Sequence, residues 1–152
     1  MRTNAYQNYF ENEILSADPV KLVQLLYRGA LDAIGCARDY LASGEIQARS
    51  TALTKAMNIL TELVLSLDHA RGGELSQNLG RVYEYTQRLL IDGNLKQLDA
   101  PLVEAERLLR TLLEAWEQSA RPQPATPVIR SYRLAPSPVD YVDYEPLNCA
   151  YY

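Results

Sequence analysis

The sequence predicts an all-α protein, an antiparallel four-helix bundle with an N-terminal amphipathic arm and a C-terminal tail rich in proline and tyrosine. Four long segments carry apolar residues at the spacing of a helix face, and glycine or proline punctuates the short links between them. After Gln118 that spacing ends and the composition changes. Because helices joined by short links pack in alternating directions, we expect one bundle. The expected organisation is an arm over 1–17, a bundle over 18–118 and a tail over 119–152.

Length, charge and cysteine content narrow the class of protein. A chain of 152 residues builds one core, and its formal net charge of −4, without clustered Lys and Arg, argues against nucleic acid as a partner. No stretch approaches the roughly 20 apolar residues that span a bilayer, and the N-terminus lacks the apolar run of a signal peptide. Cys36 and Cys149 are too few for a disulfide scaffold. We expect a cytoplasmic protein that does not insert into a membrane.

The first 17 residues place a large apolar side chain at about every fourth position among Asn, Gln and Glu. That pattern predicts a short amphipathic helix or arm. Its apolar residues are Tyr6, Tyr9, Phe10, Ile14 and Leu15.

The first long helix has an unusually wide apolar surface. Asp18 can cap it, Pro19 suits its first position, and it should end near Gly44. Two apolar stripes cover roughly 240°, whereas a helix facing one core needs little more than about 100°. Either this helix touches several neighbours, or part of the second stripe is a groove for a helix of another protein. The first stripe is Val23, Tyr27, Ala30, Ile34, Ala37 and Leu41, and the second is Leu22, Leu25, Gly29, Ala33, Cys36 and Tyr40.

The second helix, from about Glu45 to Leu67, combines an apolar seam with a strip that is nearly free of charge. The strip is either an ordinary solvated surface or a contact for a partner, because an uncharged surface costs less to desolvate. The seam is Leu53, Ala56, Leu60, Leu63 and Leu67, widened by Ala52 and Ile59. The strip is Gln47, Thr51, Thr54, Asn58, Thr61 and Leu65, between Lys55 and Glu62.

Residues 68–73 should form a turn, after which the third helix begins near Gly73 or Glu74 and stops at Gly93. The fourth helix begins at or just after Pro101. We expect Leu75, Leu79, Val82, Thr86, Leu89 and Leu90 to point inward from the third helix, and Leu102, Ala105, Leu109, Leu112 and Trp116 from the fourth.

Residues for catalysis or metal binding do not gather in the sequence. His69 is the only histidine, and no Glu-x-x-His pair of a bundle metal site occurs. Gly72 and Gly73 lack the Lys-Ser/Thr of a phosphate loop, and neither cysteine has the histidine pattern of a thiol enzyme. We expect no enzymatic activity, no cofactor and no metal.

The tail holds six of the eight prolines and five of the eleven tyrosines. Proline fixes the backbone and removes hydrogen-bond donors, so the sequence predicts an extended or disordered segment. It is an inert extension, a linear motif, or a strap whose tyrosines dock on an exposed groove. Those tyrosines are Tyr132, Tyr141, Tyr144, Tyr151 and Tyr152.

Several separated motifs occur together in one order. They are Ala5-Tyr6-Gln7, Ser16-Ala17-Asp18-Pro19, Leu26-Tyr27-Arg28-Gly29-Ala30, Leu67-Asp68, Gly72-Gly73-Glu74, Asn78-Leu79, Tyr83-Glu84-Tyr85 and Ala115-Trp116. Across residues 4–118 this set resembles the flagellar secretion chaperone family known as FliS. Arg28 departs from the acidic residue that the family often has before the glycine, and the family's usual sequence ends before the tail.

The resemblance implies a cytoplasmic four-helix bundle that binds the C-terminal segment of flagellin. Such a chaperone prevents premature polymerisation and helps deliver flagellin to a component of the flagellar type III export gate. Combined with the apolar patterning, it implies a cargo-binding set in which Tyr6, Tyr9 and Phe10 form an arm over the groove of the free protein. The set is Tyr6, Tyr9, Phe10, Leu22, Leu25, Gly29, Ile59, Leu67, Asn78, Leu79, Tyr83 and Tyr85.

Each of these residues has an alternative role in the core or on a solvated surface. Two other functions also fit the same helical patterns. The bundle could be a helical adaptor or chaperone for another export substrate, or a structural bundle whose wide first-helix face is buried by a second copy of the chain.

Overall fold

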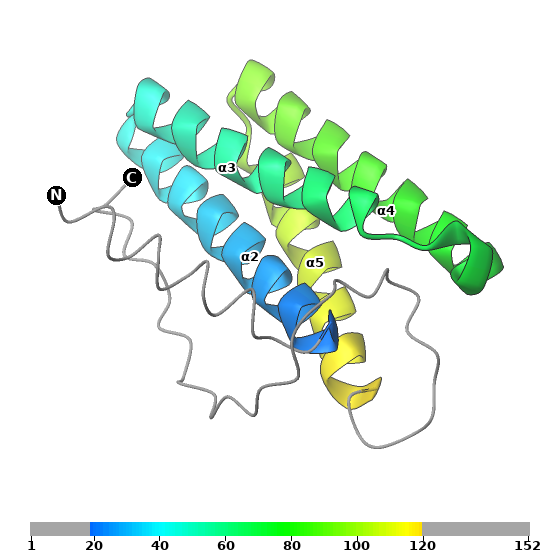
Figure 1. Cartoon of the computed structure of the whole chain (residues 1–152). Coiled ribbons are helices and arrows are strands. Elements are labelled where there is room, and N and C mark those ends of the chain that lie inside the picture. Colours follow the sequence, from blue (N-terminus) through cyan, green and yellow to red (C-terminus); the bar gives the residue numbers. More distant parts are fainter. Residues whose placement is uncertain (1–18, 120–152) are drawn as a thin grey trace, which may run out of the picture.

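The computed structural model describes residues 19–119, which form four helices and no strand (Figure 1). The helices are α2 (Pro19–Ser43), α3 (Ile46–Leu65), α4 (His69–Lys96) and α5 (Asp99–Ser119). The chain reverses direction at each link, and α2 and α4 each pack against both α3 and α5. The predicted antiparallel four-helix bundle is therefore confirmed. The predictions for the arm and for the tail beyond Ser119 lie outside the described residues.

One core of buried side chains runs through the bundle and draws on all four helices. Close packing between α2 and α3 depends on a small residue, because a Cβ atom on Gly29 would lie 3.3 Å from Cδ1 of Ile59. Small residues at a crossing let two helix backbones approach each other. The largest fully buried side chains include Tyr27, Tyr83, Ile34, Leu60, Leu63, Leu90, Leu102 and Leu109.

The third helix starts about one turn earlier than predicted, at His69, although its backbone breaks at Gly73, where the sequence predicted the start. The side chain of Asp68 accepts hydrogen bonds from the backbone N–H groups of Ala70 and Arg71, at 3.0 and 3.1 Å, and this cap starts α4 at His69. Gly73 instead makes a kink inside α4, where its φ of 51° suits glycine. The glycine pair therefore bends a helix that an acidic cap has already begun.

The predicted stop at Gly93 is also wrong, since α4 continues to Lys96. A Cβ atom on Gly93 would lie only 2.6 Å from Cδ2 of Leu102. Glycine is required here for contact with α5 and does not end the helix.

Two inward-facing predictions fail on α4 and one residue was missed on α5. Leu75 is 55% exposed. Leu67, just past the end of α3, packs near Gly80. Leu75 lies more than a helical turn before Gly80, so it extends beyond the end of α3. Val82 is only half-buried, and the adjacent Tyr83 occupies the core. On α5 the buried residue is Leu113, and Leu112 packs at the edge of the core.

Candidate functional site

A buried tyrosine pair joins three helices at one level of the bundle. The hydroxyl oxygens of Tyr27 on α2 and Tyr83 on α4 share a hydrogen bond of 2.6 Å. The indole N–H of Trp116 on α5 donates to the hydroxyl of Tyr27 at 3.2 Å. Tyr83, one of the predicted cargo residues, therefore lies inside the core.

Burial makes both tyrosines harder to ionise than an ordinary tyrosine. It raises the pKa of Tyr27 to about 12, against the opposing effect of the hydrogen bonds from Tyr83 and Trp116. Burial, with the adjacent Tyr27, also raises the pKa of Tyr83. The pair is a structural link between helices, because neither hydroxyl is poised to exchange a proton near neutral pH.

Four apolar or small residues lie on the side of α2 that points away from Tyr27, judged by the turn of about 100° per residue in a helix. We call this set the outer face of α2, and its members are Leu22, Leu25, Gly29 and Cys36. Leu22 and Leu25 are only 4% and 5% exposed. Yet among the described residues they are the two buried apolar side chains that stand apart from the connected core.

Ile59 of α3 adjoins the outer face of α2 through its close approach to Gly29. Four predicted cargo residues, namely Leu22, Leu25, Gly29 and Ile59, thus lie along one side of the α2–α3 pair. Their side chains are aliphatic or absent, so this side of the helix pair is apolar.

The other described candidates are not part of that surface. Leu67 and Leu79 are core residues, as is Tyr83. Asn78 and Tyr85 are exposed on α4, where the hydroxyl of Tyr85 donates to Glu104 of α5 at 2.7 Å. That hydrogen bond to a carboxylate raises the pKa of Tyr85. The predicted set therefore divides into an α2–α3 surface, a core group and an α4–α5 surface, while Tyr6, Tyr9 and Phe10 lie outside the described residues.

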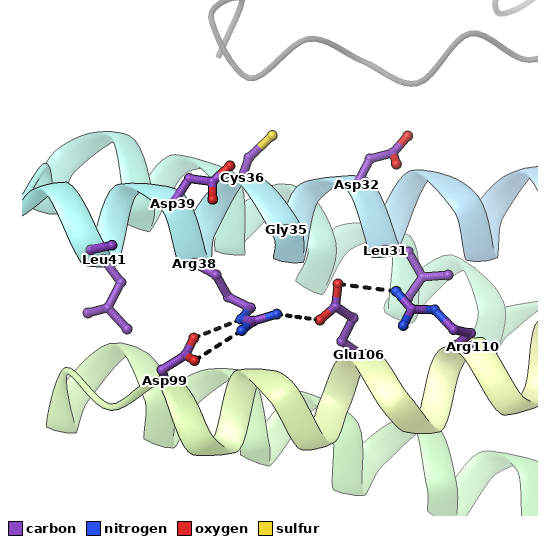
Figure 2. A pocket seen from close by; sticks show the side chains of 11 residues that line it. Leu31, Asp32, Gly35, Cys36, Arg38, Asp39, Leu41, Asp99, Glu106 and Arg110 are labelled. Atoms are coloured by element: carbon purple, nitrogen blue, oxygen red, sulfur yellow. Dashed lines mark hydrogen bonds and ion pairs between the residues drawn. The ribbon is translucent and has the colours of Figure 1, made fainter.

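Sequence reasoning missed a charged network between α2 and α5. Arg38 of α2 donates two hydrogen bonds to the carboxylate of Asp99, at 2.7 and 3.1 Å, and a third to Glu106 at 2.7 Å (Figure 2). The second oxygen of Glu106 lies 3.5 Å from Arg110. Arg38 lowers the pKa of Asp99, whose position in the first turn of α5 also favours negative charge. The network fastens the start of α5 to α2.

An open cavity of about 690 Å³ lies along this network (Figure 2). Its lining mixes the charged side chains of α2 and α5 with apolar residues of α2, including Leu31, Cys36 and Leu41. Asp32 and Asp39 line it as well. Cys36 is the one member of the outer face of α2 that lines this cavity.

A buried arginine is the second feature that the sequence did not reveal. Arg49 of α3 is almost fully buried, and its guanidinium donates to the side-chain and backbone oxygens of Asn94, at 3.0 and 3.4 Å. Asn94 lies in the last turn of α4, where carbonyl oxygens attract a cation. Both arginine contacts join residues far apart in the chain, so only the folded bundle brings them together.

Over residues 19–119, no three His, Cys, Asp or Glu side chains gather as potential metal ligands. None of the four described helices has the length and apolar character needed to cross a bilayer.

Comparison with known proteins decides the family. Residues 2–123 match a family model described as flagellar protein FliS. The chain belongs to the FliS family. The family match ends at residue 123, so it includes all four helices of the bundle and leaves most of the tail outside.

Curated FliS relatives match over most of their own length. The flagellar secretion chaperone FliS of Salmonella typhimurium is 38% identical over 109 residues, which cover 71% of this chain and 81% of the relative. The FliS proteins of Escherichia coli and Bacillus subtilis are 35% and 33% identical, over 77% and 76% of this chain and 88% and 86% of theirs. Membership of the FliS family supports a role as a flagellar export chaperone.

Proposed function

We propose that this FliS-family protein is a cytoplasmic chaperone that binds the C-terminal segment of flagellin and delivers it to the flagellar type III export gate. Family membership supports the export role, and the outer face of α2 supports the site. The observation that carries the site is the burial of Leu22 and Leu25 outside the connected core. Residues 1–17, with Tyr6, Tyr9 and Phe10, cover this face until cargo displaces them.

The outer face of α2 and Ile59 offer what an amphipathic segment needs. Leu22 and Leu25 supply aliphatic contact, and Ile59, which packs close to Gly29, extends the apolar surface onto α3. The network of Arg38 with Asp99 and Glu106 lies between α2 and α5, near the end of α2 that is distant from Leu22 and Leu25. The protein acts by binding and carries out no chemical step.

Binding couples to folding of the cargo. A segment that orders as it binds typically buries about 1,000 to 3,000 Å² and loses roughly 2 to 5 kcal/mol to ordering. That loss keeps the complex selective while leaving it weak enough to dissociate at the gate. While the segment is bound, its apolar side chains are unavailable to other flagellin molecules, which prevents polymerisation.

A calorimetric titration with one variant and one matched control tests the site. The ligand is a peptide of about 40 residues from the flagellin C-terminus of the same organism, long enough to bury an area of that size. Leu25→Glu places a charge on the proposed surface and should weaken binding about tenfold or more. Leu95→Glu makes the same change at a leucine of α4 that is 76% exposed, and it should bind like the wild type.

Circular dichroism checks that both variants keep their helices. Equal affinity for Leu25→Glu and wild type would place the cargo elsewhere on the bundle. Hydrogen exchange tests the arm: residues 1–17 should lose protection when the peptide binds, and unchanged protection argues against displacement.

A second candidate function follows from exposed apolar side chains at one end of the bundle. Ile46 begins α3, while Leu95 and Leu98 lie at the end of α4 and in the next link, and all three are exposed. The contact of Arg49 with Asn94 places these segments at the same end. A self-assembling bundle would bury this end, so sedimentation without cargo should show mass rising with concentration. A chaperone for another export substrate would remain monomeric and fail to bind the flagellin peptide.

A further inference from the structure

The uncharged strip of α3 faces away from the core along the whole helix. All of its members are exposed, and they recur at alternating steps of four and three residues. At 3.6 residues per turn they fall within about 80° of the helix circumference, opposite the buried residues Ala56 and Leu60. The members are Gln47, Thr51, Thr54, Asn58, Thr61 and Leu65.

The spacing and the hydrogen bonds of this strip both suit contact with another helix. Alternating steps of four and three residues are the spacing at which one helix packs along a second one. The hydroxyls of its three threonines donate to backbone oxygens four residues earlier, at 2.9 to 3.0 Å. Because these donors already have partners inside the helix, covering them does not leave a buried donor unsatisfied.

The two ends of the strip have opposite shapes. Leu65, at the end of α3, is the one large aliphatic residue of the strip and is 63% exposed. At the start of α3 the surface is hollowed by an open cavity of about 500 Å³. The residues that line this cavity are Glu45, Ile46, Gln47, Ala48 and Thr51. A projecting side chain at one end and a cavity at the other fit each other only if two copies of α3 run in opposite directions.

The order of the steps gives the strip the symmetry that such a pair requires. Steps of four, three, four, three and four read the same in both directions, so an antiparallel copy places every member level with another. The level pairs are Gln47 with Leu65, Thr51 with Thr61, and Thr54 with Asn58. Leu65 of each copy then lies at the cavity of the other copy. A two-fold interface needs this kind of self-complementarity, because the same surface is used twice.

Charge at the border of the strip favours the same orientation. Lys55 and Glu62 lie on one edge of it. In the antiparallel pair, Lys55 of one copy and Glu62 of the other share an edge and are separated by about 8 Å along the helix axis. Opposite charges at that separation still attract at physiological ionic strength. Lys55 also interacts with Asp32 of α2, and an ammonium group has donors for both carboxylates.

We propose that α3 is the interface of a two-fold homodimer, in which the uncharged strips of two copies pack antiparallel and each Leu65 enters the cavity of the other copy. The strip is about 27 Å long. Specific interfaces bury at least about 1,000 Å², and one helix pair of this length lies near that limit, so we expect a dissociation constant of micromolar order. The dimer does not rest on the flagellar cargo, because Ile59 lies about 100° around α3 from Asn58.

Sedimentation equilibrium of the full-length protein, with one variant and one matched control, tests the interface. The wild type should pass from one to two copies as its concentration rises through the micromolar range. Thr54→Arg places two like charges near the two-fold axis and should raise the dissociation constant about tenfold or more.

Thr111→Arg is the matched control. Thr111 is an exposed threonine whose hydroxyl also donates to the backbone oxygen four residues earlier, at 3.0 Å. It lies on α5, diagonally across the bundle from α3, so this variant should dimerise like the wild type. Circular dichroism checks that both variants keep their helices. A wild type that stays monomeric, or equal dissociation constants for the two variants, would overturn the proposal.

Rising mass alone does not separate this dimer from association through the exposed leucines at the end of α4. Leu95→Glu leaves the strip of α3 intact and should dimerise like the wild type. Loss of the dimer in Leu95→Glu, with a normal dimer in Thr54→Arg, would place the interface at that other end and overturn the proposal.

Photo-cross-linking tests the orientation of the two copies. With Leu65 replaced by p-benzoylphenylalanine, the excited ketone takes a hydrogen from a nearby C–H group and bonds to that carbon, becoming a tertiary alcohol. A mixture of ¹⁵N-labelled and unlabelled protein identifies links between copies by mass spectrometry. The antiparallel pair predicts links to residues 45–51 of the second copy. Links to residues 61–69 alone would mean a parallel pair and would overturn the proposed arrangement.

Discussion

Single hydroxyl groups hold the middle of the bundle together. Tyr27 and Tyr83 are both buried, and each would lose a partner if the other lacked its oxygen. A neutral hydrogen bond contributes roughly 0.5 to 1.5 kcal/mol, and a buried polar group left without its partner costs about 1 to 3 kcal/mol. The pair therefore fixes the relative positions of α2 and α4 more than it adds to total stability.

Removing one hydroxyl should lower the free energy of unfolding by more than the hydrogen bond itself contributes. Tyr83→Phe leaves the hydroxyl of Tyr27 with Trp116 alone, and we expect a loss of about 1 to 2 kcal/mol in the free energy of unfolding. Urea unfolding measures this loss of stability. The double variant Tyr27→Phe with Tyr83→Phe should recover part of the loss, and an effect that is simply additive would contradict the coupling.

Alkaline pH should weaken the same contact. The pKa of Tyr27 is about 12 in the folded protein, against 10.0 for an ordinary tyrosine. Because the folded-state value is the higher one, the stability contributed by the neutral hydroxyl is complete below pH 10 and is lost as the pH rises toward 12. Unfolding midpoints across this range should fall more steeply in the wild type than in the double phenylalanine variant. Parallel pH profiles would contradict the assignment.

At the scale of the elements, glycines have different roles in different helices. Gly93 lets α4 pack against Leu102 of α5, where a Cβ atom would be far too close. Gly35 lies in the interior of α2, and a Cβ atom there would meet nothing within 4 Å. One glycine is required by helix packing, and the other has no steric requirement.

Alanine substitutions separate these two roles. Gly93→Ala should lower the free energy of unfolding by about 1 to 3 kcal/mol, because an added methyl group in a tight contact forces a shift of its neighbours. Gly35→Ala is the matched control, and should raise stability by up to about 1 kcal/mol through helix propensity. Thermal unfolding of both variants provides the measurement. Equal effects of the same sign would show that the contact with Leu102 is not tight.

Periodicity predicted the helices well because it indicates which apolar side chains are buried in the folded protein. The inward stripe of α2 was identified from spacing alone, and Tyr27 and Ile34 are fully buried. The errors came where two local signals competed. The cap at Asp68 overrode the glycine pair that follows it, and the tertiary contact of Gly93 overrode its usual role as a helix stop.

Pairings between distant segments could not be predicted. Arg38 and Asp99 are 61 positions apart, and no local pattern links them. The same limit applies to the cargo set, because spacing marks an apolar residue without showing which surface covers it. Leu79 and Tyr83 therefore joined the predicted site although they belong to the core.

For the molecule as a whole, the bundle is a frame that places the apolar outer face of α2 close to the start of α2 and the end of α5. The first helix begins at Pro19 and the last ends at Ser119, and their contacts bring these ends together. We propose that the arm before α2 covers the outer face of α2 and gives way to cargo.

The most direct measurement is the set of intermolecular nuclear Overhauser effects between the flagellin C-terminal peptide and methyl-labelled protein. Contacts should reach the methyl groups of Leu22, Leu25 and Ile59, and leave those of Ile91 and Leu95 on α4 without any. That result would place the cargo on the outer face of α2 and the adjoining residue of α3. Contacts to Ile91 and Leu95 alone, or no complex at all, would contradict it.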